Sequence, residues 1–507
     1  MPARAALASL IALTLIAGAP LRAEIAEPDV ELAIGKAQQA AGREDCAGVL
    51  GALDPVVEGL AAGPQRNVIQ RMRLVCLSEQ GRLADLPLVQ RELAASMPRD
   101  GVVKAFGVLI AADENRFADA ADQIATLAET SPRALNVLSG AAVRAISMRL
   151  AEDHARDVRG RMLIALARAD WEPADIPELR VGFAEGAIEA LIDQGEPAEA
   201  EGLLERIEQP EQLSAMAVDR HFAKLWPALE TRLGPASATS VERFARAKLS
   251  AYGDSPGSEV ALRDAADAML LLGRYQDVVD LTQDVRVVDG MSREAVRTVL
   301  YRARALAALR RNDEVDRLLA PFLALDIQSA PAASTALVSY AEFLDEAGRA
   351  AKALVVTREA RSKSGDMLTD LGKRWLDRTE VCTLAALGRT AEAASAMDAL
   401  KRLSSQNPSA TIEALLCAGR DSEASQLTIK AFDDSDAAND LLVQFQPAGS
   451  VLAPTPSRLR ALWTSFLARP EVKAAFDRKG RILPRVLWPD PKPRAIPRRP
   501  ANGAALT

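Results

Sequence analysis

A recurrent pair of positions constrains the fold of this chain more than any other feature. A turn residue, Gly or Asn, is followed five positions later by a small or β-branched apolar residue at seven places: Gly42/Ala47, Asn115/Ala120, Gly195/Ala200, Gly273/Val278, Gly348/Ala353, Gly388/Ala393 and Gly419/Ala424. With Gly81 included, successive turns lie 39, 34, 80, 78, 75, 40 and 31 residues apart, and each large gap has room for two units. Such periods are typical of helical hairpins that bury their apolar faces by stacking. We predict an all-α chain, an α-solenoid of about ten to eleven stacked antiparallel hairpins.

The clearest unit spans residues 260–285, where an apolar segment ending at Leu272 is followed by the turn at Gly273. This unit resembles the tetratricopeptide repeat (TPR) family. In that family a small residue lies seven positions before the turn glycine, an aromatic residue two after it and alanine five after it. The corresponding residues here are Ala266, Tyr275 and Val278. The closing proline of the family pattern is mostly missing. The resemblance implies TPR-like architecture, with a groove for extended peptides lined by the first helix of each hairpin.

Composition also favours helices over sheets. Aromatic residues make up only 4% of the chain, and the charged residues, 26% of it, alternate in sign as on solvated helix faces. Asp100-Gly101 and Asp289-Gly290 could form hairpin turns, but neither has alternating β-branched runs on both sides. Beyond the N-terminus no window holds the roughly 18 apolar residues that a membrane span needs, so we expect a soluble mature protein.

The first 23 residues have the pattern of a secretory signal peptide. An early arginine precedes an uncharged run over residues 5–21, and a small residue, Ala23, follows it. A membrane anchor is the alternative. The run is shorter than the ~20 apolar residues of a span, however, and is interrupted by Gly18 and Pro20. We therefore predict cleavage after Ala23 and a periplasmic protein.

Four cysteines form two pairs, each separated by about one repeat. Cys46 lies at the start of a second helix and Cys76 near the end of the next first helix, so these ends should meet in an antiparallel stack. Cys382 and Cys417 both fall in the last turns of successive first helices. We predict disulfides Cys46–Cys76 and Cys382–Cys417, which suit an oxidising compartment. Free core cysteines or a metal site are the alternatives, but a zinc site would require CxxC or nearby histidines.

Clusters of proline and glycine indicate internal boundaries. Residues 234–237 (Gly-Pro-Ala-Ser) interrupt the helix pattern, with an ordinary inter-helix loop as the alternative, and prolines after Gln444 end the array. An amphipathic piece from Arg458 to Arg478 should then form a capping helix. The predicted parts are a signal peptide (1–23), an N-terminal helical-repeat array (24–232), a C-terminal TPR-like array (238–445), a capping helix region (446–480) and a basic proline-rich tail (481–507).

Charge is unevenly distributed between the body and the tail. From Lys473 onward nine basic residues face two aspartates, a charge of +7, whereas residues 24–472 carry −16. The prolines of the tail favour an extended polyproline-type backbone. Two arrangements stay open. The tail is either disordered or loosely docked, or it is an arm anchored by Trp488 that contacts an anionic surface such as lipid headgroups or lies along the acidic body. Nucleic acid is not an expected partner.

Residues suited to catalysis or cofactor binding are few. The two histidines, His154 and His221, fall in different repeats, which argues against a triad or a multi-histidine metal centre. The acidic run 433–436 lacks the glycine and the terminal glutamate of a calcium loop, and no glycine-rich phosphate-binding motif occurs. We therefore expect no catalytic residue, metal or cofactor. The tryptophans at apolar helix positions are expected in the core: Trp171, Trp226, Trp375 and Trp463.

The pattern favours a non-catalytic scaffold that binds a protein or peptide partner in the cell envelope. The alternative is a glycan-binding protein or cell-wall enzyme built on a helical solenoid, and self-association is a third possibility. Charge reversal at groove residues should weaken partner capture without lowering thermal stability. The groove candidates are polar first-helix residues of the best repeats: Arg263, Asp267, Arg302, Glu342, Asp345 and Arg378.

Overall fold

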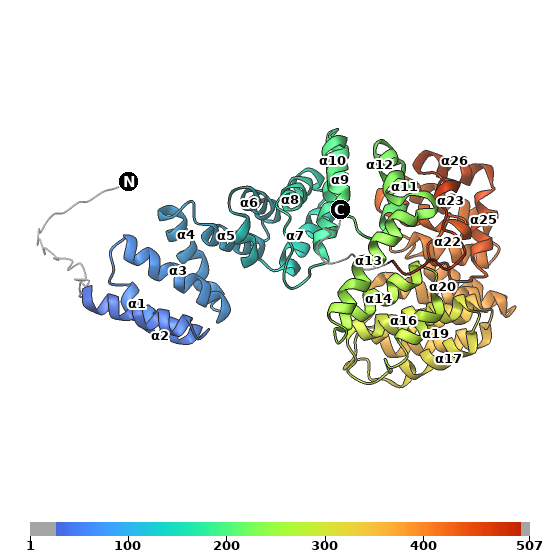
Figure 1. Ribbon diagram of the computed structural model, residues 1–507, viewed down its shortest axis with the longest axis horizontal. Coiled ribbons are helices and arrows are strands. Elements are labelled where there is room, and N and C mark those ends of the chain that lie inside the picture. The colour runs from blue at the N-terminus through green and yellow to red at the C-terminus, as the bar shows by residue number, and fades with distance from the viewer. Residues whose placement is uncertain (1–26, 498–507) are drawn as a thin grey trace, which may run out of the picture. The chain divides into compact units, whose positions relative to one another are not determined.

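The computed structural model describes residues 27–497, which form helices joined by short connections (Figure 1). Within these residues there is no strand, and the single β feature is an isolated antiparallel bridge between Asp219 and Gly480. The predicted all-α class is therefore confirmed for this part of the chain. The predicted signal peptide and residues 498–507 of the tail lie outside the described residues. None of the helices between residues 27 and 497 is long and apolar enough to cross a membrane.

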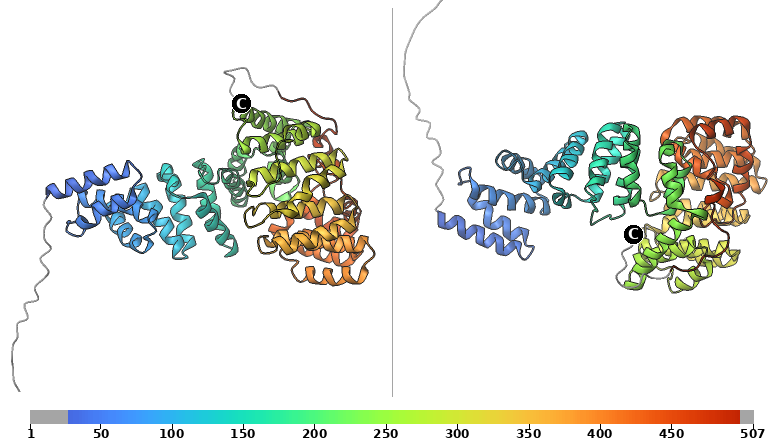
Figure 2. Two further views of the ribbon diagram at one scale, coloured as in Figure 1. Left: turned by 90° about the horizontal axis from the view of Figure 1, so that it is seen from below. Right: turned by 45° about the horizontal axis from the view of Figure 1, so that its top comes forward.

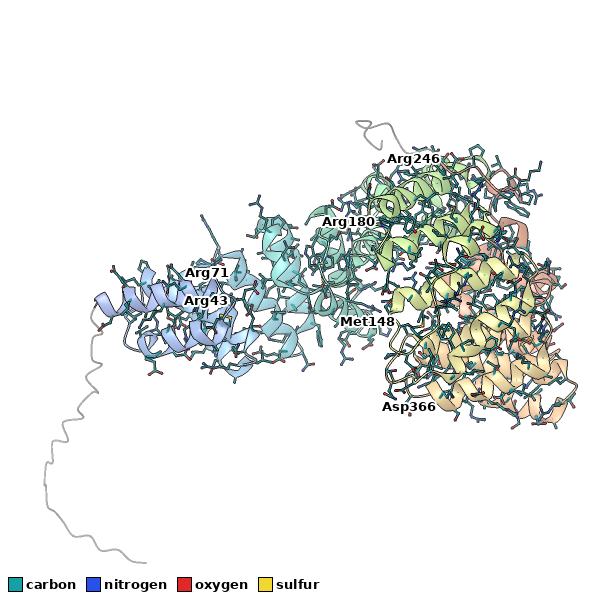
Figure 3. All side chains as sticks on the ribbon, turned by 60° about the horizontal axis from the view of Figure 1, so that its bottom comes forward. Arg43, Arg71, Met148, Arg180, Arg246 and Asp366 are labelled. Atoms are coloured by element: carbon teal, nitrogen blue, oxygen red, sulfur yellow. A yellow bond between two sulfur atoms is a disulfide. The ribbon has the colours of Figure 1, made fainter. Side chains whose placement is uncertain are left out.

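The chain divides into two units, and the division falls after Ala190, inside α9 (Leu179–Gln194). In unit 1, consecutive helices such as α1 and α2, or α5 and α6, pack against each other. The other helices of unit 1 are α1 (Glu27–Ala41), α2 (Cys46–Val57), α3 (Pro64–Glu79), η1 (Leu83–Asp85), α4 (Leu86–Ser96), α5 (Gly101–Asp113), α6 (Phe117–Thr130), η2 (Pro132–Val137), α7 (Gly140–Glu152) and α8 (Arg156–Arg168). Arg43, in the turn between α1 and α2, and Arg71 of α3 are exposed charged residues of this unit (Figure 3).

Unit 2 holds the remaining helices, and its consecutive helices also pack in pairs. They are α10 (Pro197–Leu203), η3 (Leu204–Arg206), α11 (Pro210–Val218), η4 (Arg220–Leu225), α12 (Trp226–Leu233), η5 (Pro235–Ser237), α13 (Ala238–Asp254), α14 (Glu259–Leu271), α15 (Tyr275–Leu281), α16 (Arg293–Ala308), α17 (Asn312–Leu319), η6 (Ala320–Ala324), α18 (Ala333–Glu346), α19 (Ala350–Ser364), α20 (Asp370–Ala386), α21 (Thr390–Lys401), α22 (Pro408–Cys417), α23 (Asp421–Asp433), α24 (Ser435–Gln444), η7 (Ala448–Ser450), α25 (Arg460–Leu467), α26 (Pro470–Lys479) and η8 (Arg485–Leu487).

The proline-containing stretch at 234–237 is a turn within unit 2, not the point at which the chain divides. It joins α12 and α13, and these two helices pack on each other. Gly234, Ala236 and Ser237 all have positive φ, a conformation that only glycine adopts without a steric cost. Ser237 is fully buried, and its hydroxyl donates a 2.6 Å hydrogen bond to the Leu487 carbonyl. The boundary that we predicted here is corrected to the middle of α9.

Most of the predicted turn residues adopt the left-handed conformation that ends a first helix. Positive φ occurs at Gly81, Asn115, Gly195, Gly273, Gly348, Gly388 and Gly419. The three large gaps each contain further residues with positive φ, among them His154, Gly234 and Arg310, which lie between consecutive helices. Gly42 is an exception, because the left-handed residue of that turn is Glu44. Each large gap therefore contains a further turn between helices, where the double spacing indicated one.

An arginine after the turn stabilises the start of many second helices. Arg82 pairs with Asp85 at 2.7 Å, and Arg389 pairs with Glu392 at 2.6 Å, in each case three residues into the helix. An acidic group in the first helical turn also interacts favourably with the helix dipole. The same arrangement recurs in four more hairpins: Arg116–Asp119, Arg274–Asp277, Arg311–Glu314 and Arg420–Glu423.

Both predicted disulfides are present with the predicted connectivity. Cys46, the first residue of α2, is bonded to Cys76 in α3, with Cα atoms 4.9 Å apart. Cys382 in α20 is bonded to Cys417 at the end of α22, with Cα atoms 5.0 Å apart. Each bond links two neighbouring hairpins, one in each unit. The turn pattern therefore places successive helices correctly in both halves of the chain.

The capping region is two helices, α25 and α26, where we predicted one from Arg458 to Arg478. The break falls at Ala468 and Arg469, because Pro470 has no amide hydrogen and starts a new helix. Both helices pack on the last hairpin, through contacts of α26 with α23 and of α25 with α22. Their aromatic side chains form a cluster with residues of α23 and the end of α24: Phe432, Phe445, Trp463, Phe466 and Phe476.

Unit 2 closes on itself, because its first helices contact its last ones. α11 packs on α24, and η4 packs on α26, as the two views of Figure 2 also show. Arg481 connects the two ends of the unit. Its amide donates to the Val218 carbonyl at 2.9 Å, and its guanidinium pairs with Glu230 at 2.7 Å. The same guanidinium lies 3.7 Å from the centroid of the Trp226 ring.

The described part of the tail, residues 481–497, lies along the body of unit 2. The Arg494 amide donates to the Leu272 carbonyl at 2.8 Å. Trp488 is half-buried, and its indole nitrogen donates to the Leu483 carbonyl at 2.7 Å. Of the two arrangements that the sequence left open, these residues adopt the one in which the tail lies back on the body.

We expect each disulfide to stabilise its own unit. Replacing Cys382 and Cys417 together by alanine should lower the free energy of unfolding of unit 2 by about 3 to 4 kcal/mol, because the bond closes a long loop. The Cys46/Cys76 double variant should act in the same way on unit 1. Chemical unfolding under oxidising conditions measures both effects. Under reducing conditions wild type and variants should have the same free energy of unfolding. A difference that persists under these conditions would show that the loss of the disulfide is not the cause.

Arg481→Ala should lower the free energy of unfolding of unit 2 by about 1 to 3 kcal/mol. The substitution removes the stacking on Trp226 and the ion pair with Glu230, both partly shielded from water. Arg478→Ala, at an exposed position of the same region, is the control and should change the value by less than about 0.5 kcal/mol. Equal effects of the two substitutions would show that Arg481 does not join the ends of unit 2.

Candidate functional site

Unit 2 contains a hollow of about 1680 Å³. Its walls are the first helices α16, α18 and α20, with the edge of α17 and residues from the segment 448–463. Pockets for small molecules are typically about 300–1,000 Å³, so this one is larger. The first helices therefore face a concave space, as the predicted architecture requires.

One side of the hollow is closed by residues 447–458, here called the strap. The prolines of the strap have no amide hydrogen to donate, so helix α24 does not continue into this segment. Near its start Leu452 is buried in one apolar cluster with residues of α13 and α14. At its end the Arg458 guanidinium donates to the backbone carbonyl of Asp345 at 2.8 Å and to its carboxylate at 2.5 Å. The strap thus extends from α13 and α14 to α18.

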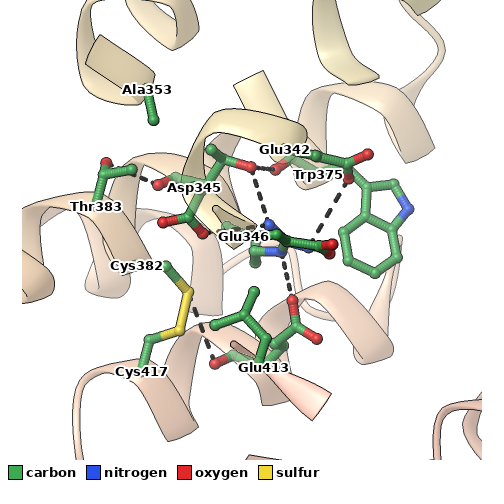
Figure 4. A network of polar contacts seen from close by, with 12 residues as sticks. Glu342, Asp345, Glu346, Ala353, Trp375, Cys382, Thr383, Glu413 and Cys417 are labelled. Atoms are coloured by element: carbon green, nitrogen blue, oxygen red, sulfur yellow. Dashed lines mark hydrogen bonds and ion pairs between the residues drawn. A yellow bond between two sulfur atoms is a disulfide. The ribbon is translucent and has the colours of Figure 1, made fainter. Parts of the chain in front are cut away.

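A buried cation, Arg378 of α20, lines the hollow. Figure 4 shows the carboxylates of Glu342, Asp345, Glu346 and Glu413 that gather in this network. Only 3% of the Arg378 side chain is exposed, and its Nε lies 2.6 Å from the Glu413 carboxylate. Asp345, Glu342 and Glu346 lie within 3.6 to 3.9 Å of the same guanidinium. These four carboxylates come from α18 and α22, so Arg378 holds three helices together.

Two aromatic residues complete this network. The indole nitrogen of Trp463 in α25 donates a 2.6 Å hydrogen bond to Oε2 of Glu413, whereas Oε1 has no hydrogen-bond donor and forms only the ion pair with Arg378. The ring centroid of Trp375 lies 5.0 Å from the Arg378 guanidinium. Trp171 and Trp463 are buried as we predicted, whereas Trp226 and Trp375 are only half-buried and stack on arginines.

Burial raises the pKa values of three carboxyl groups of the network, those of Glu342, Asp345 and Glu346. Burial raises the pKa of Glu346 to about 8; Arg378 opposes this shift, and Glu342, Glu413 and Asp345 add to it. The pKa of Glu342 and that of Asp345 are raised as well, again first by burial. Burial alone would lower the pKa of Arg378, but the surrounding carboxylates raise it above its usual value. Glu342 and Glu346 remain 28% and 23% exposed because they face the hollow.

A second polar group lies at residues of α11, α14 and α16. Desolvation by the surrounding helices, together with the neighbouring Asp267, raises the pKa of Glu211, although this residue is exposed at the surface. Burial also raises the pKa of Asp267, and nearby Arg304 and Arg297 oppose that shift. Arg297 donates a 3.4 Å hydrogen bond to the hydroxyl of Tyr301, which lines the hollow.

The structure does not bring the six predicted groove residues together at one place. Glu342, Asp345 and Arg378 meet in the network described above, and Asp267 belongs to the second polar group. Arg263 is 6% exposed and pairs with Asp264 at 2.6 Å and with Glu294 at 3.5 Å.

Arg302 is corrected from a groove residue to a structural one. It is 7% exposed and donates to the backbone carbonyls of Thr282 and Val285 at 2.7 and 2.8 Å, just after α15. Four of the candidates are buried: Arg263, Arg302, Asp345 and Arg378. Charge reversal at these four would leave buried charges without partners, so the expectation that it spares stability is also corrected.

Sequence reasoning missed the arginines of the α16 wall. Arg293, Arg297 and Arg304 all line the hollow, and their spacing of four and seven residues places them on one helix face. That spacing was visible in the sequence. The strap carried no such local signal, because its place is set by contacts with distant helices.

The described residues contain no group of three or more His, Cys, Asp or Glu side chains that could hold a metal ion. His154 is the exposed left-handed residue of the turn between α7 and α8. His221 lies 3.8 Å from Asp193, and neither histidine lines the hollow. The arrangement is chemically suited to binding through charge and apolar contact. No protein-family model matches the chain, and no curated protein matches its sequence.

The stability of unit 2 should fall as the pH rises from about 5 to about 9. A carboxyl group with a raised pKa in the folded state contributes its full stability below its unfolded pKa and loses it as the pH rises through the folded value, about 8 for Glu346. Glu346→Gln, which copies the protonated form, should therefore raise the melting temperature at pH 9 and flatten the pH profile.

The matched control is Glu359→Gln in α19, a partly exposed glutamate outside the network. Its pH profile should follow that of wild type. A Glu346→Gln profile as steep as that of the control would mean that Glu346 is ionised at neutral pH in the folded protein. Thermal melts at a series of pH values give both profiles.

Proposed function

We propose that this protein is a non-catalytic, exported scaffold of the TPR-like α-solenoid type, which binds a peptide or a protein segment in the hollow of unit 2. The observation that carries the proposal is that an extended piece of polypeptide, the strap, forms one side of the hollow and is held there by the surrounding helices. Leu452 and Arg458 of the strap use the two kinds of contact, apolar and charged, that a bound peptide would use.

The size and the walls of the hollow support a peptide ligand. At about 1680 Å³ the hollow exceeds typical small-molecule pockets. Its wall combines aromatic and apolar side chains such as Phe343, Leu300 and Trp375 with arginines and glutamates. A ligand of mixed character, as an extended peptide is, matches such a wall.

Export to the periplasm is supported by two kinds of observation. Residues 1–23 have the pattern of a signal peptide, and both disulfides suit an oxidising compartment. The partner is accordingly a protein or peptide of the cell envelope. Weak contact of the basic tail with an anionic surface belongs to the same proposal.

Photo-cross-linking in intact cells tests this function. With p-benzoylphenylalanine at Leu300, which lines the hollow, we expect a cross-link to a protein partner. The matched control is Val355 on α19, which is 62% exposed and does not line the hollow, and should give none. Cross-links from both positions would argue against binding in the hollow. Retention of the protein on cell-wall glycan, without a protein cross-link from Leu300, would favour the alternative of a glycan-binding protein or cell-wall enzyme.

A further inference from the structure

The second half of the strap, residues 452–458, is attached to the helices around it mainly at its two ends. At one end Leu452, only 5% exposed, is buried in the cluster of α13 and α14. At the other end Arg458 makes two hydrogen bonds to Asp345 through its side chain and one, of 3.4 Å, from its amide to the Glu346 carbonyl. Between these ends Ala453 packs against the same cluster as Leu452, and no hydrogen bond joins residues 453–456 to any other described residue. A segment held at two points can be released more easily than one held along its length.

The conformation and surroundings of the strap also favour release. Ala453 has φ of +46°, a left-handed conformation that is unfavourable for a residue with a Cβ atom. Pro454, Thr455 and Ser457 all border the hollow, so the strap lies beside open space and not inside a filled core. The strap therefore forms one wall of the hollow and leaves its interior open.

The site that holds Arg458 carries an excess of negative groups. Four carboxylates surround two arginines, Arg378 and Arg458, and Glu342 and Glu346 lie 3.9 Å from their nearest cation. One oxygen of the fully buried Asp345 carboxylate, Oδ2, has no hydrogen-bond donor. An arginine arriving at this place is thus favoured by charge and by unused acceptor capacity.

We propose that the strap covers one side of the binding hollow in place of a partner, and that the partner is an extended peptide of the same chemistry, which displaces it. Such a peptide carries an apolar residue for the α13–α14 cluster and, six positions later, an arginine for Asp345 and Glu346. This inference rests on the proposed function and adds the class of partner and the manner in which the site is kept closed.

The test uses a fluorescent peptide with the sequence of residues 450–460 and the full-length mature protein. In wild type the attached strap competes at high effective concentration, so the free peptide should bind weakly. In the variant Leu452→Ala/Arg458→Ala the competitor is weakened, and the peptide should bind at least tenfold more tightly by fluorescence anisotropy. The same peptide with Arg458→Glu should lose at least tenfold in affinity for this variant.

Two controls keep the outcome unambiguous. Arg317→Ala removes an exposed arginine of α17 outside the hollow and should bind the peptide as wild type does. If the double variant is poorly folded, the single variant Arg458→Ala replaces it, because this side chain is 32% exposed. Its affinity for the peptide should be several-fold higher than that of wild type. Equal affinity of wild type and both strap variants, or no binding to either variant, would overturn the inference.

The failure of this inference is distinct from failure of the proposed function. In one outcome the residue introduced at Leu300 cross-links to an envelope protein whose contact segment lacks the apolar residue and the arginine. In that case the hollow binds peptides, but these peptides do not resemble the strap. If Leu300 gives no protein cross-link and the strap peptide does not bind, both proposals fail. A cross-linked segment that carries both residues would support the two proposals together.

Discussion

Unit 2 depends on the burial of one cation, Arg378. Its guanidinium is 3% exposed and is surrounded by carboxylates from α18 and α22, while its own helix, α20, lies between them. The removal of a charge from water is costly, and the cost is offset only when every partner is in place. Through Glu413 the network reaches Trp463 of α25, and through Asp345 it reaches Arg458 of the strap. Three first helices, the cap and the strap thus share one electrostatic centre.

The local features of this fold were predictable from the sequence because their causes are local. A left-handed residue ends each first helix, and glycine or asparagine is the residue that adopts this conformation at least cost, so most turns could be read directly. Where His154 and Arg310 take that role, the residue type gives no signal, and only the double spacing indicated a turn. The disulfides followed from the register of the turns, because neighbouring hairpins bring residues one repeat apart together.

The non-local features could not be predicted in the same way. Arg302 and Asp345 were recognised as polar first-helix residues, but whether such a residue faces the hollow or the interior depends on how successive hairpins rotate. The prolines of the strap indicated an interruption of the array, yet its path across α14 to α18 is set by Leu452 and Arg458 at their distant partners. The closure of unit 2 by Arg481 likewise joins residues more than two hundred positions apart.

The same chemistry explains why the binding surface and the stabilising network coincide. A partner that displaces the strap must replace Arg458, because an unpaired Asp345 at zero exposure would lose its charge compensation. Asp345, whose pKa is raised first by burial, can lessen that cost by holding a proton while the site is open. The charge of an arginine at the place of Arg458 lowers the pKa of Asp345 and so favours release of this proton. Occupancy of the site and the protonation of Asp345 are therefore linked, and the affinity for an arginine-bearing segment rises with pH as Asp345 ionises.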